Sequence, residues 1–372
     1  MGKTAIILEK KEELLSIRGL SIRFRQYKGG SGHQAFSQAD LSVISGLDVT
    51  VRRGEVVAVV GASGSGKSLL AHAVLGLLPA NAFLEGSIRY RGKELCPQDQ
   101  KGKKKAFFRS RESGGVPGIA LVPQSVTWLD PLMKIGRQVL GGRKTPEARQ
   151  RMRMLFARYG LSGEVENLYP FECSGGMIRR ILLTAALMDD PELIIADEPT
   201  PGMDASLAKQ AMDELRGFAD EGGGVLLITH DIELALRGAD RIAVFYAGTT
   251  VEVAAAADFE EEKRLRHPYT KALWRAMPAN GFAAVSGMQP YVKDLPEGCV
   301  YQDRCPYFSP ACRGKIPLRS VRGGLVRCIR PFDREMRMEK EDSDPGWGMK
   351  TGNVPEREEA AYAGSEESDV FL

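Results

Sequence analysis

The chain has 372 residues, of which 43% are hydrophobic and 27% are charged, and its formal net charge is +3. This balance is typical of a globular protein with a sizeable core, organised as one large domain and a smaller one. No apolar run reaches the roughly 18 residues that a membrane-spanning helix requires, and the first residues lack the apolar core of a signal peptide. We therefore expect a cytoplasmic protein, and any membrane role must depend on partners.

Charge is unevenly distributed along the chain. Residues 333–372 hold twelve acidic and five basic residues, so the remainder carries a net charge of +10. The acidic segment is polar and has no periodicity, which predicts a disordered tail. The densest basic run, residues 101–111, lacks an interleaved aromatic ladder, so we expect ordinary surface charge there and no nucleic-acid binding.

Two patterns of apolar residues predict two kinds of sheet. Residues 14–25 and 42–51 alternate apolar and polar side chains, which indicates a half-exposed antiparallel sheet near the N-terminus. Short continuous apolar runs further along suit strands that are buried on both faces. These runs are residues 56–60, 119–123, 193–197, 225–229 and 241–248. Helical patterns separate them, so the expected fold is α/β with a parallel sheet.

The segment from about 127 to 180 has a helical pattern, of which residues 145–160 ("TPEARQRMRMLFARYG") are the clearest part. It lies between two of the predicted strands of the parallel sheet. We therefore expect a small helical subdomain inserted into the α/β domain.

The octapeptide "GASGSGKS" (residues 61–68) lies between a predicted strand and a predicted helix. This is the G-x-x-x-x-G-K-S pattern in which backbone amides and a helix N-terminus surround nucleotide phosphates. Lys67 is expected to reach the β- and γ-phosphates of ATP, and Ser68 to ligate Mg²⁺. The residues predicted to contact the nucleotide are Gly61, Ser63, Gly64, Ser65, Gly66, Lys67 and Ser68.

Two further predicted strands end in residues suited to ATP hydrolysis. "LIIADEP" (193–199) places Asp197 at a strand end, where it can hold Mg²⁺ through water, and Glu198 next to it as a general base. "VLLITHD" (225–231) ends its strand in His230, which can contact the γ-phosphate.

The heptapeptide "FECSGGM" (171–177) has two structural interpretations. The glycines could form an ordinary tight turn, or they could leave the N-terminal amides of the next helix bare for an anion. Ser174 is a suitable N-cap for that helix.

The motifs taken in order resemble the ATP-binding subunit of ABC transporters over residues 14 to 275. The set comprises "GASGSGKS", "VPQ", "CSGGM", "LIIADE", "PGMD" and "ITHD". The resemblance implies a P-loop NTPase (RecA-like) core, with Gln124 sensing Mg²⁺ and the γ-phosphate and Asp204 at a dimer seam. It further implies that Ser174, Gly175 and Gly176 bind ATP held by the opposite subunit. Phe24 and Tyr27 are alternative candidates for stacking on adenine.

Residues 122–139 and 266–278 ("RHPYTKALWRAMP") resemble segments of the peptide/nickel importer subfamily. The third shared feature is a group of four cysteines, Cys299, Cys305, Cys312 and Cys328. Disulfides are not expected in a cytoplasmic chain, whereas four thiolates can hold zinc or an iron–sulfur cluster. The short Cys-x₂₋₄-Cys pairs of structural zinc sites are missing. The resemblance implies a [4Fe–4S] cluster, and zinc or unliganded thiols remain alternatives.

The predicted organisation has three parts. Residues 1–278 form the ATPase domain, residues 279–332 a cysteine-rich extension, and residues 333–372 the acidic tail. The resemblance implies a motor that drives uptake of peptides, nickel or a metal–chelator complex. Its implied partners are two membrane permease subunits, a second ATPase subunit of the same or a related chain and, indirectly, an extracytoplasmic substrate-binding protein.

Two other functions are alternatives to this hypothesis: a soluble ABC ATPase and an iron–sulfur-sensing regulatory protein. The soluble ATPases usually have two fused cassettes, whereas this chain has one P-loop. The relatives that act on chromosomes insert a long coiled coil, but Lys67 and Ser174 are only 107 positions apart. A regulatory protein would lack hydrolytic residues, which are present here. The favoured location is therefore the cytoplasmic face of the cell membrane.

Overall fold

The structure, a computed structural model, describes residues 11–28, 37–62, 64–95, 116–124, 128–200, 203, 205–285 and 287–330. All described residues belong to one compact unit, Met1–Asp333. The predicted disordered tail and the basic run at residues 101–111 lie outside the described residues.

The described residues form a large sheet with the strand order β11-β12-β10-β9-β3-β8-β7-β6. Five of its strands are parallel to one another and correspond to the five apolar runs. They are β3 (Glu55–Val60), β6 (Ile119–Val122), β7 (Leu193–Asp197), β8 (Gly224–Thr229) and β9 (Arg241–Tyr246). The prediction of an α/β fold with a parallel sheet is confirmed.

The large sheet continues past β9 with three antiparallel strands. β10 (Thr249–Ala255) pairs with β9, β12 (Gly324–Val326) pairs with β10, and β11 (Arg319–Val321) pairs with β12. The β11–β12 hairpin belongs to the cysteine-rich extension. The sequence pattern did not predict that this extension adds strands to the large sheet.

A second sheet, β2-β1-β4-β5, is antiparallel, as predicted from the alternating pattern. Its strands are β1 (Glu13–Lys28), β2 (Ser37–Arg52), β4 (Ala82–Tyr90) and β5 (Lys93–Glu94). Apolar residues of this sheet share one core with α1 (Lys67–Val74) and with one face of the large sheet, including Val57 and Val59 of β3. The antiparallel sheet and α1 therefore cover that face.

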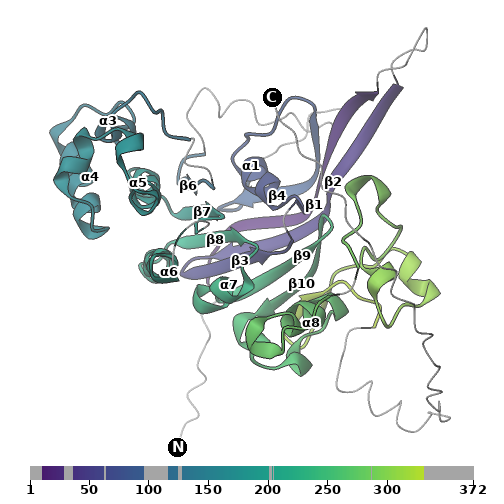
Figure 1. Ribbon diagram of the computed structural model, residues 1–372. Coiled ribbons are helices and arrows are strands. Elements are labelled where there is room, and N and C mark those ends of the chain that lie inside the picture. Colours follow the sequence, from purple (N-terminus) through teal and green to yellow (C-terminus); the bar gives the residue numbers. More distant parts are fainter. Residues whose placement is uncertain are drawn as a thin grey trace, which may run out of the picture. The chain divides into compact units, whose positions relative to one another are not determined.

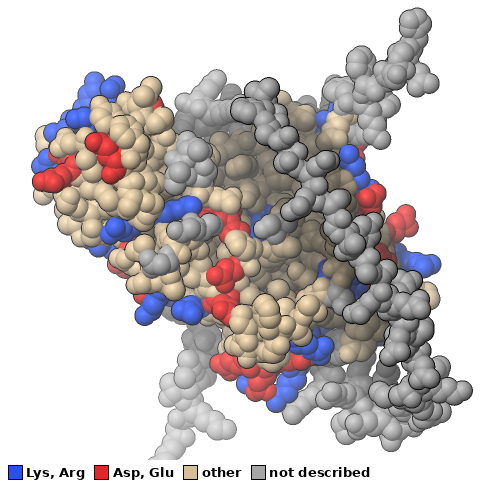
Figure 2. Space-filling view, viewed as in Figure 1, with Lys and Arg blue, Asp and Glu red and all other residues tan. Residues whose placement is uncertain are grey.

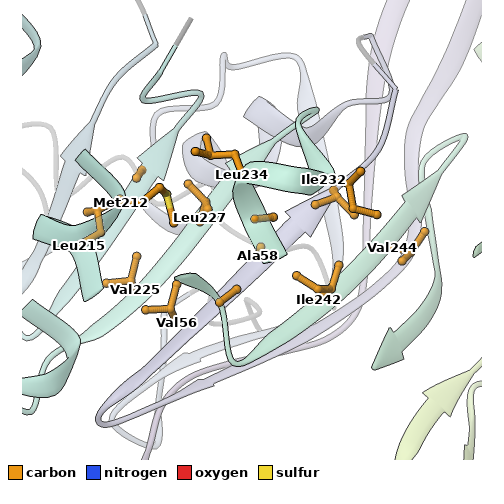
Figure 3. Close-up of a cluster of buried hydrophobic side chains, with 14 of the residues drawn as sticks. Val56, Ala58, Met212, Leu215, Val225, Leu227, Ile232, Leu234, Ile242 and Val244 are labelled. Carbon is orange, nitrogen blue, oxygen red and sulfur yellow. The ribbon is translucent and has the colours of Figure 1, made fainter. Parts of the chain in front are cut away.

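The opposite face of the large sheet is covered by α6 (Ala205–Asp220) and α7 (Ile232–Gly238). Figure 3 shows Val56 and Ala58 of β3 among the apolar side chains of these helices. Because successive residues of a strand point to opposite faces, β3 contributes to both cores. This explains why its sequence is continuously apolar.

The chain between β6 and β7 is helical, and Figure 1 shows its helices beside the large sheet. It contains α3 (Ile135–Leu140), α4 (Pro146–Arg158) and α5 (Gly175–Leu187). These helices have a small core of their own, to which Phe156 and Ile181 belong.

The remaining elements are α8 and several short 3₁₀ turns. They are α8 (Pro268–Arg275), η2 (Gly163–Asn167), η3 (Pro170–Glu172), η4 (Ala256–Glu260), η5 (Glu262–Arg264), η6 (Pro278–Asn280), η7 (Val292–Asp294), η8 (Gln302–Arg304) and η9 (Pro310–Arg313). None of the helices in the described part of the chain is long and apolar enough to cross a membrane. Figure 2 shows basic and acidic side chains interspersed over the visible face.

Candidate active site

The loop between β3 and α1 has a backbone that favours glycine at two positions. Gly64 and Gly66 have φ angles of +75° and +95°, in the region that glycine adopts without strain. A Cβ atom at Gly61 would lie 2.3 Å from the carbonyl oxygen of Phe245 in β9. The loop therefore lies directly against the end of the neighbouring strand and turns immediately into α1.

Lys67 and Ser65 are buried polar residues among the described residues of this loop. The Nζ atom of Lys67 donates hydrogen bonds to the carbonyl oxygens of Gly61 (2.8 Å) and Ala62 (2.9 Å). Burial lowers the pKa of Lys67, and the nearby carboxylates of Glu198 and Asp197 oppose that shift. Ser65 is 2% exposed, and its hydroxyl has no hydrogen-bond partner among the described residues. A buried, unpartnered donor beside helix N-terminal amides fits an anionic ligand.

Asp197 is the last residue of β7 and faces the start of α1. The hydroxyl of Ser68 donates a hydrogen bond to its Oδ1 atom at 3.2 Å. Burial raises the pKa of Asp197, and the hydrogen bond from Ser68 opposes the shift. A hydroxyl and a carboxylate at this distance are a donor set that suits Mg²⁺.

Glu198 and His230 are brought together by the parallel pairing of β7 with β8. Nδ1 of His230 lies 2.9 Å from both carboxylate oxygens of Glu198, and the hydroxyl of Thr229 lies 3.4 Å from Oε2. Glu198 has a φ angle of +45°, which is strained for a residue with a side chain. Thr229 was not predicted as a site residue; its signal in the sequence is its place at the strand end, immediately before His230.

The Ser174-Gly175-Gly176 segment lies apart from this group. Ser174 is the N-cap of α5, and its hydroxyl accepts a hydrogen bond from the amide of Met177 at 3.2 Å. A Cβ atom at Gly175 would have no neighbour within 4 Å. Figure 1 shows α5 and α1 apart, with β6 and β7 between them. Within one chain, the structure therefore does not join Ser174 to Lys67.

The other predicted site residues are Gln124, Ser63 and Asp204. Gln124 is exposed just after β6, and Nη1 of Arg179 in α5 donates to the carbonyl of the preceding residue, Pro123, at 3.3 Å. Ser63 and Asp204 lie outside the described residues.

The two aromatic candidates for adenine stacking both lie on β1. Phe24 is partly buried against the core, and the side chain of Tyr27 lies outside the description. For both residues, stacking on adenine stays a prediction.

The four cysteines of the extension line one small cavity, together with His267. Burial raises the pKa of Cys299 and that of Cys328 to about 11, and the neighbouring thiols contribute to both shifts. The number and type of donors fit a four-thiolate group. In the part of the chain that the structure describes, however, no three His, Cys, Asp or Glu side chains form a group that could hold a single metal ion.

The P-loop against β9, the Ser68–Asp197 pair and the Glu198–His230 pair define an ATPase of the ABC class. The ABC transporter family matches residues 44–201, and the "Oligopeptide/dipeptide transporter, C-terminal region" family matches residues 251–312.

Curated relatives include the oligopeptide transport ATP-binding protein OppD of Escherichia coli. It is 31% identical over 87% of this chain and 95% of its own length. The dipeptide transport ATP-binding protein DppD of the same species is 32% identical over 82% of this chain and 95% of its own. This chain therefore belongs to the ATP-binding proteins of ABC transporters, in the branch with the oligopeptide/dipeptide C-terminal region.

Solved structures agree with this fold. A dimeric bacterial ABC transporter cassette is 23% identical with a TM-score of 0.51 and covers 65% of this chain and 99% of its own. The cbiO1 protein from Clostridium perfringens, part of an ABC transporter complex, has a TM-score of 0.51 at 24% identity. It covers 68% of this chain and 93% of its own.

Proposed function

We propose that this chain is the ATP-hydrolysing motor subunit of a peptide importer, located at the cytoplasmic face of the membrane. The observation that carries the proposal is the meeting of Lys67, Ser68, Asp197, Glu198 and His230 at one edge of the large sheet. The names of the curated relatives support peptides as the cargo. Nickel or a metal–chelator complex is the alternative cargo, and an uptake assay distinguishes them.

In this proposal the loop at residues 61–68 binds the phosphates of ATP. Lys67 exchanges its loop carbonyls for the β- and γ-phosphate oxygens, and the amides of α1 face the same charge. Ser68 and Asp197 would hold Mg²⁺, with Gln124 as a further ligand. When bound, Mg²⁺ neutralises the charge that develops on the phosphates.

Glu198 is the proposed general base for the attacking water. The carboxylate is held by the ring of His230 and by the hydroxyl of Thr229. A fixed orientation matters because most of the catalysis of phosphoryl transfer comes from positioning and electrostatics. The strained backbone of Glu198 is a feature that active sites often retain.

The second half of each ATP site is proposed to come from another ATPase subunit. The separation of α5 from α1 supports this, because Ser174, Gly175 and Gly176 do not lie beside Lys67 of the same chain. Asp204 would lie at the seam between the subunits. The partner is the same or a related chain, and both would move two membrane permease subunits that receive cargo from an extracytoplasmic binding protein.

We also propose that Cys299, Cys305, Cys312 and Cys328 hold a [4Fe–4S] cluster, supported by their shared cavity. The cluster would supply a structural or redox-active centre in the extension. Iron and sulfide analysis of anaerobically purified chain tests this, with about four of each per chain expected. Stoichiometric zinc, or no metal, overturns the cluster.

Replacing Glu198 by Gln tests the ATPase assignment. The amide keeps the shape of the side chain but cannot accept the proton, so steady-state ATP hydrolysis should fall by at least about a hundredfold. ATP binding should persist, because Lys67 and the loop are unchanged. The exposed Glu147→Gln variant is the control and should hydrolyse ATP at the wild-type rate. Unchanged hydrolysis in Glu198→Gln would refute the assignment of the base.

A further inference from the structure

Strand β2 contains an extra residue opposite β1. Leu47 pairs with Leu20 and Ile44 pairs with Ile22, so Ser45 and Gly46 together face a single residue of β1. Gly46 has a φ angle of +74°, which completes a β-bulge. Such a bulge bends its strand and removes local groups from the ladder of hydrogen bonds. The groups at this bend therefore need partners from elsewhere.

Arg327, which follows β12 in the cysteine-rich extension, supplies a partner for the bulge. Its Nη2 atom donates to the carbonyl of Gly46 at 2.9 Å and to the carboxylate of Asp48 at 3.0 Å. Its Nε atom donates to the carbonyl of Thr250 in β10, and Nη1 donates to that of Ile316. The side chain is only 21% exposed. One guanidinium thus joins the bulge, the large sheet and the extension.

The residues of β2 that immediately precede the bulge lie against the nucleotide-binding loop. A Cβ atom at Gly66 would lie 3.1 Å from Cγ1 of Val43 and 3.4 Å from the carbonyl oxygen of Val43. The amide of Ser45 also donates to the carbonyl of Gly248 at 2.7 Å. Gly66 is the N-cap of α1, so a shift of β2 moves the start of the helix whose amides face the phosphates.

We propose that Arg327 is a positioning residue for ATP binding. By holding the bulge at Gly46, it fixes Val43 against Gly66 and thereby sets the geometry of the loop. Through Arg327, the cysteine-rich extension then contributes to the geometry of the nucleotide site. The inference rests on the proposed function only in taking residues 61–68 as the ATP-binding loop.

An Arg327→Met variant of the full-length chain tests this role. Methionine fills part of the space but donates no hydrogen bond, so the carbonyl of Gly46 loses the donor that Arg327 supplies. We expect the Kd for a fluorescent ATP analogue to rise about three- to tenfold, the size of effect that residues along a coupling path produce. Arg327→Lys keeps the charge beside Asp48 but loses the planar guanidinium with its several N–H donors. Its Kd should therefore lie between those of wild type and Arg327→Met.

The matched control is Arg313→Met in the same extension, where Arg313 packs over the ring of Phe308. Its Kd should equal that of wild type. A folded Arg327→Met with a Kd within twofold of wild type overturns the proposal, as does an equal rise in Arg313→Met. If Arg327→Met does not fold, the Kd of Arg327→Lys is the test, and a Kd within twofold of wild type overturns the proposal. A wild-type chain that binds no ATP analogue refutes the proposed function and, with it, this inference.

Discussion

At the scale of single residues, the proposed nucleotide site depends on places where a side chain has no room. Gly61 lies where the P-loop meets β9, and an added Cβ atom would contact the carbonyl oxygen of Phe245. The loop cannot yield easily, because Lys67 ties the carbonyls of Gly61 and Ala62 together. The absence of a side chain at Gly61 is therefore as much a part of the site as the lysine.

Replacing Gly61 by Ala should displace the loop from β9. We expect a loss of about 1–3 kcal/mol in the free energy of unfolding from overpacking, together with loss of ATP binding. Urea denaturation and binding of an ATP analogue measure the two effects. Gly163→Ala is the control, because an added Cβ atom there has no neighbour within 4 Å. Wild-type ATP binding by Gly61→Ala would contradict the proposed fit of the loop.

Several residues of the proposed site were identifiable from sequence because each follows a recognisable strand. Asp197, Glu198 and His230 end parallel strands, and the carboxyl ends of such strands meet at one edge of a sheet. Arg327 was not identifiable. It lies 281 positions from Gly46 in sequence, and no local pattern marks an arginine that satisfies a distant bulge.

At the scale of elements, α5 and α6 enclose a small cavity of about 30 Å³ that Gly176, Arg180 and Glu214 line. Burial raises the pKa of Glu214 to about 7, while Arg180 and Arg158 oppose the shift. The folded chain therefore binds more protons at this carboxyl than the unfolded chain between about pH 4.5 and 7. The contribution of the Glu214 carboxyl to the free energy of unfolding is therefore lost as the pH rises through that range.

Glu214→Gln should remove this pH dependence. The variant should gain stability relative to wild type as the pH rises from 5 to 8. The gain should be about 1 kcal/mol or less, because the partly exposed carboxyl is screened by solvent. Thermal unfolding of both proteins at several pH values measures the difference. A difference in Tm that is the same at pH 5 and pH 8 would argue against a protonated Glu214.

A buried arginine attaches the β11–β12 hairpin to the core. Nη1 of Arg266 lies 3.2 Å from Glu252 and 2.9 Å from Asp258. Its Nε atom donates to the carbonyl of Val321 at the end of β11 (2.7 Å), and Nη2 donates to that of Arg322 in the turn of the hairpin (2.5 Å). Both Arg266 and Glu252 are almost fully buried, so the carboxylate of Glu252 depends on Arg266 for charge compensation.

Arg266→Met should therefore be strongly destabilising. It leaves the carboxylate of Glu252 buried without its cation, which costs about 3–5 kcal/mol. Urea denaturation measures this cost. Arg275→Met, which removes a half-exposed ion pair with Glu262, should cost less than about 1 kcal/mol. Similar losses in the free energy of unfolding of the two variants would show that the buried ion pair contributes no more than the half-exposed one.

The parallel strands and the helices between them were predictable because their periodicity and length are local properties. The addition of β11 and β12 to the large sheet was not. Each of these strands has only three residues, which is too short for a pattern to appear. Their pairing depends on the side chain of Arg266 and on the free edge of β10, neither of which is visible in the sequence of the hairpin.

At the scale of the unit Met1–Asp333, the large sheet runs without interruption from the cysteine-rich extension to the strands of the proposed ATP site. β12 pairs with β10, β10 with β9, and β9 with β3, which leads into the P-loop. The extension is therefore built into the sheet that carries the proposed catalytic residues. This arrangement agrees with a motor subunit that carries its own C-terminal region.

The most direct test of the proposed function is affinity purification of the tagged chain from detergent-solubilised membranes. The proposed importer predicts that two multi-spanning membrane proteins and a second ATPase subunit are recovered with it in stoichiometric amounts. Recovery of the chain only from the soluble fraction, alone or bound to ribosomes or DNA, would contradict its role as the motor of a transporter.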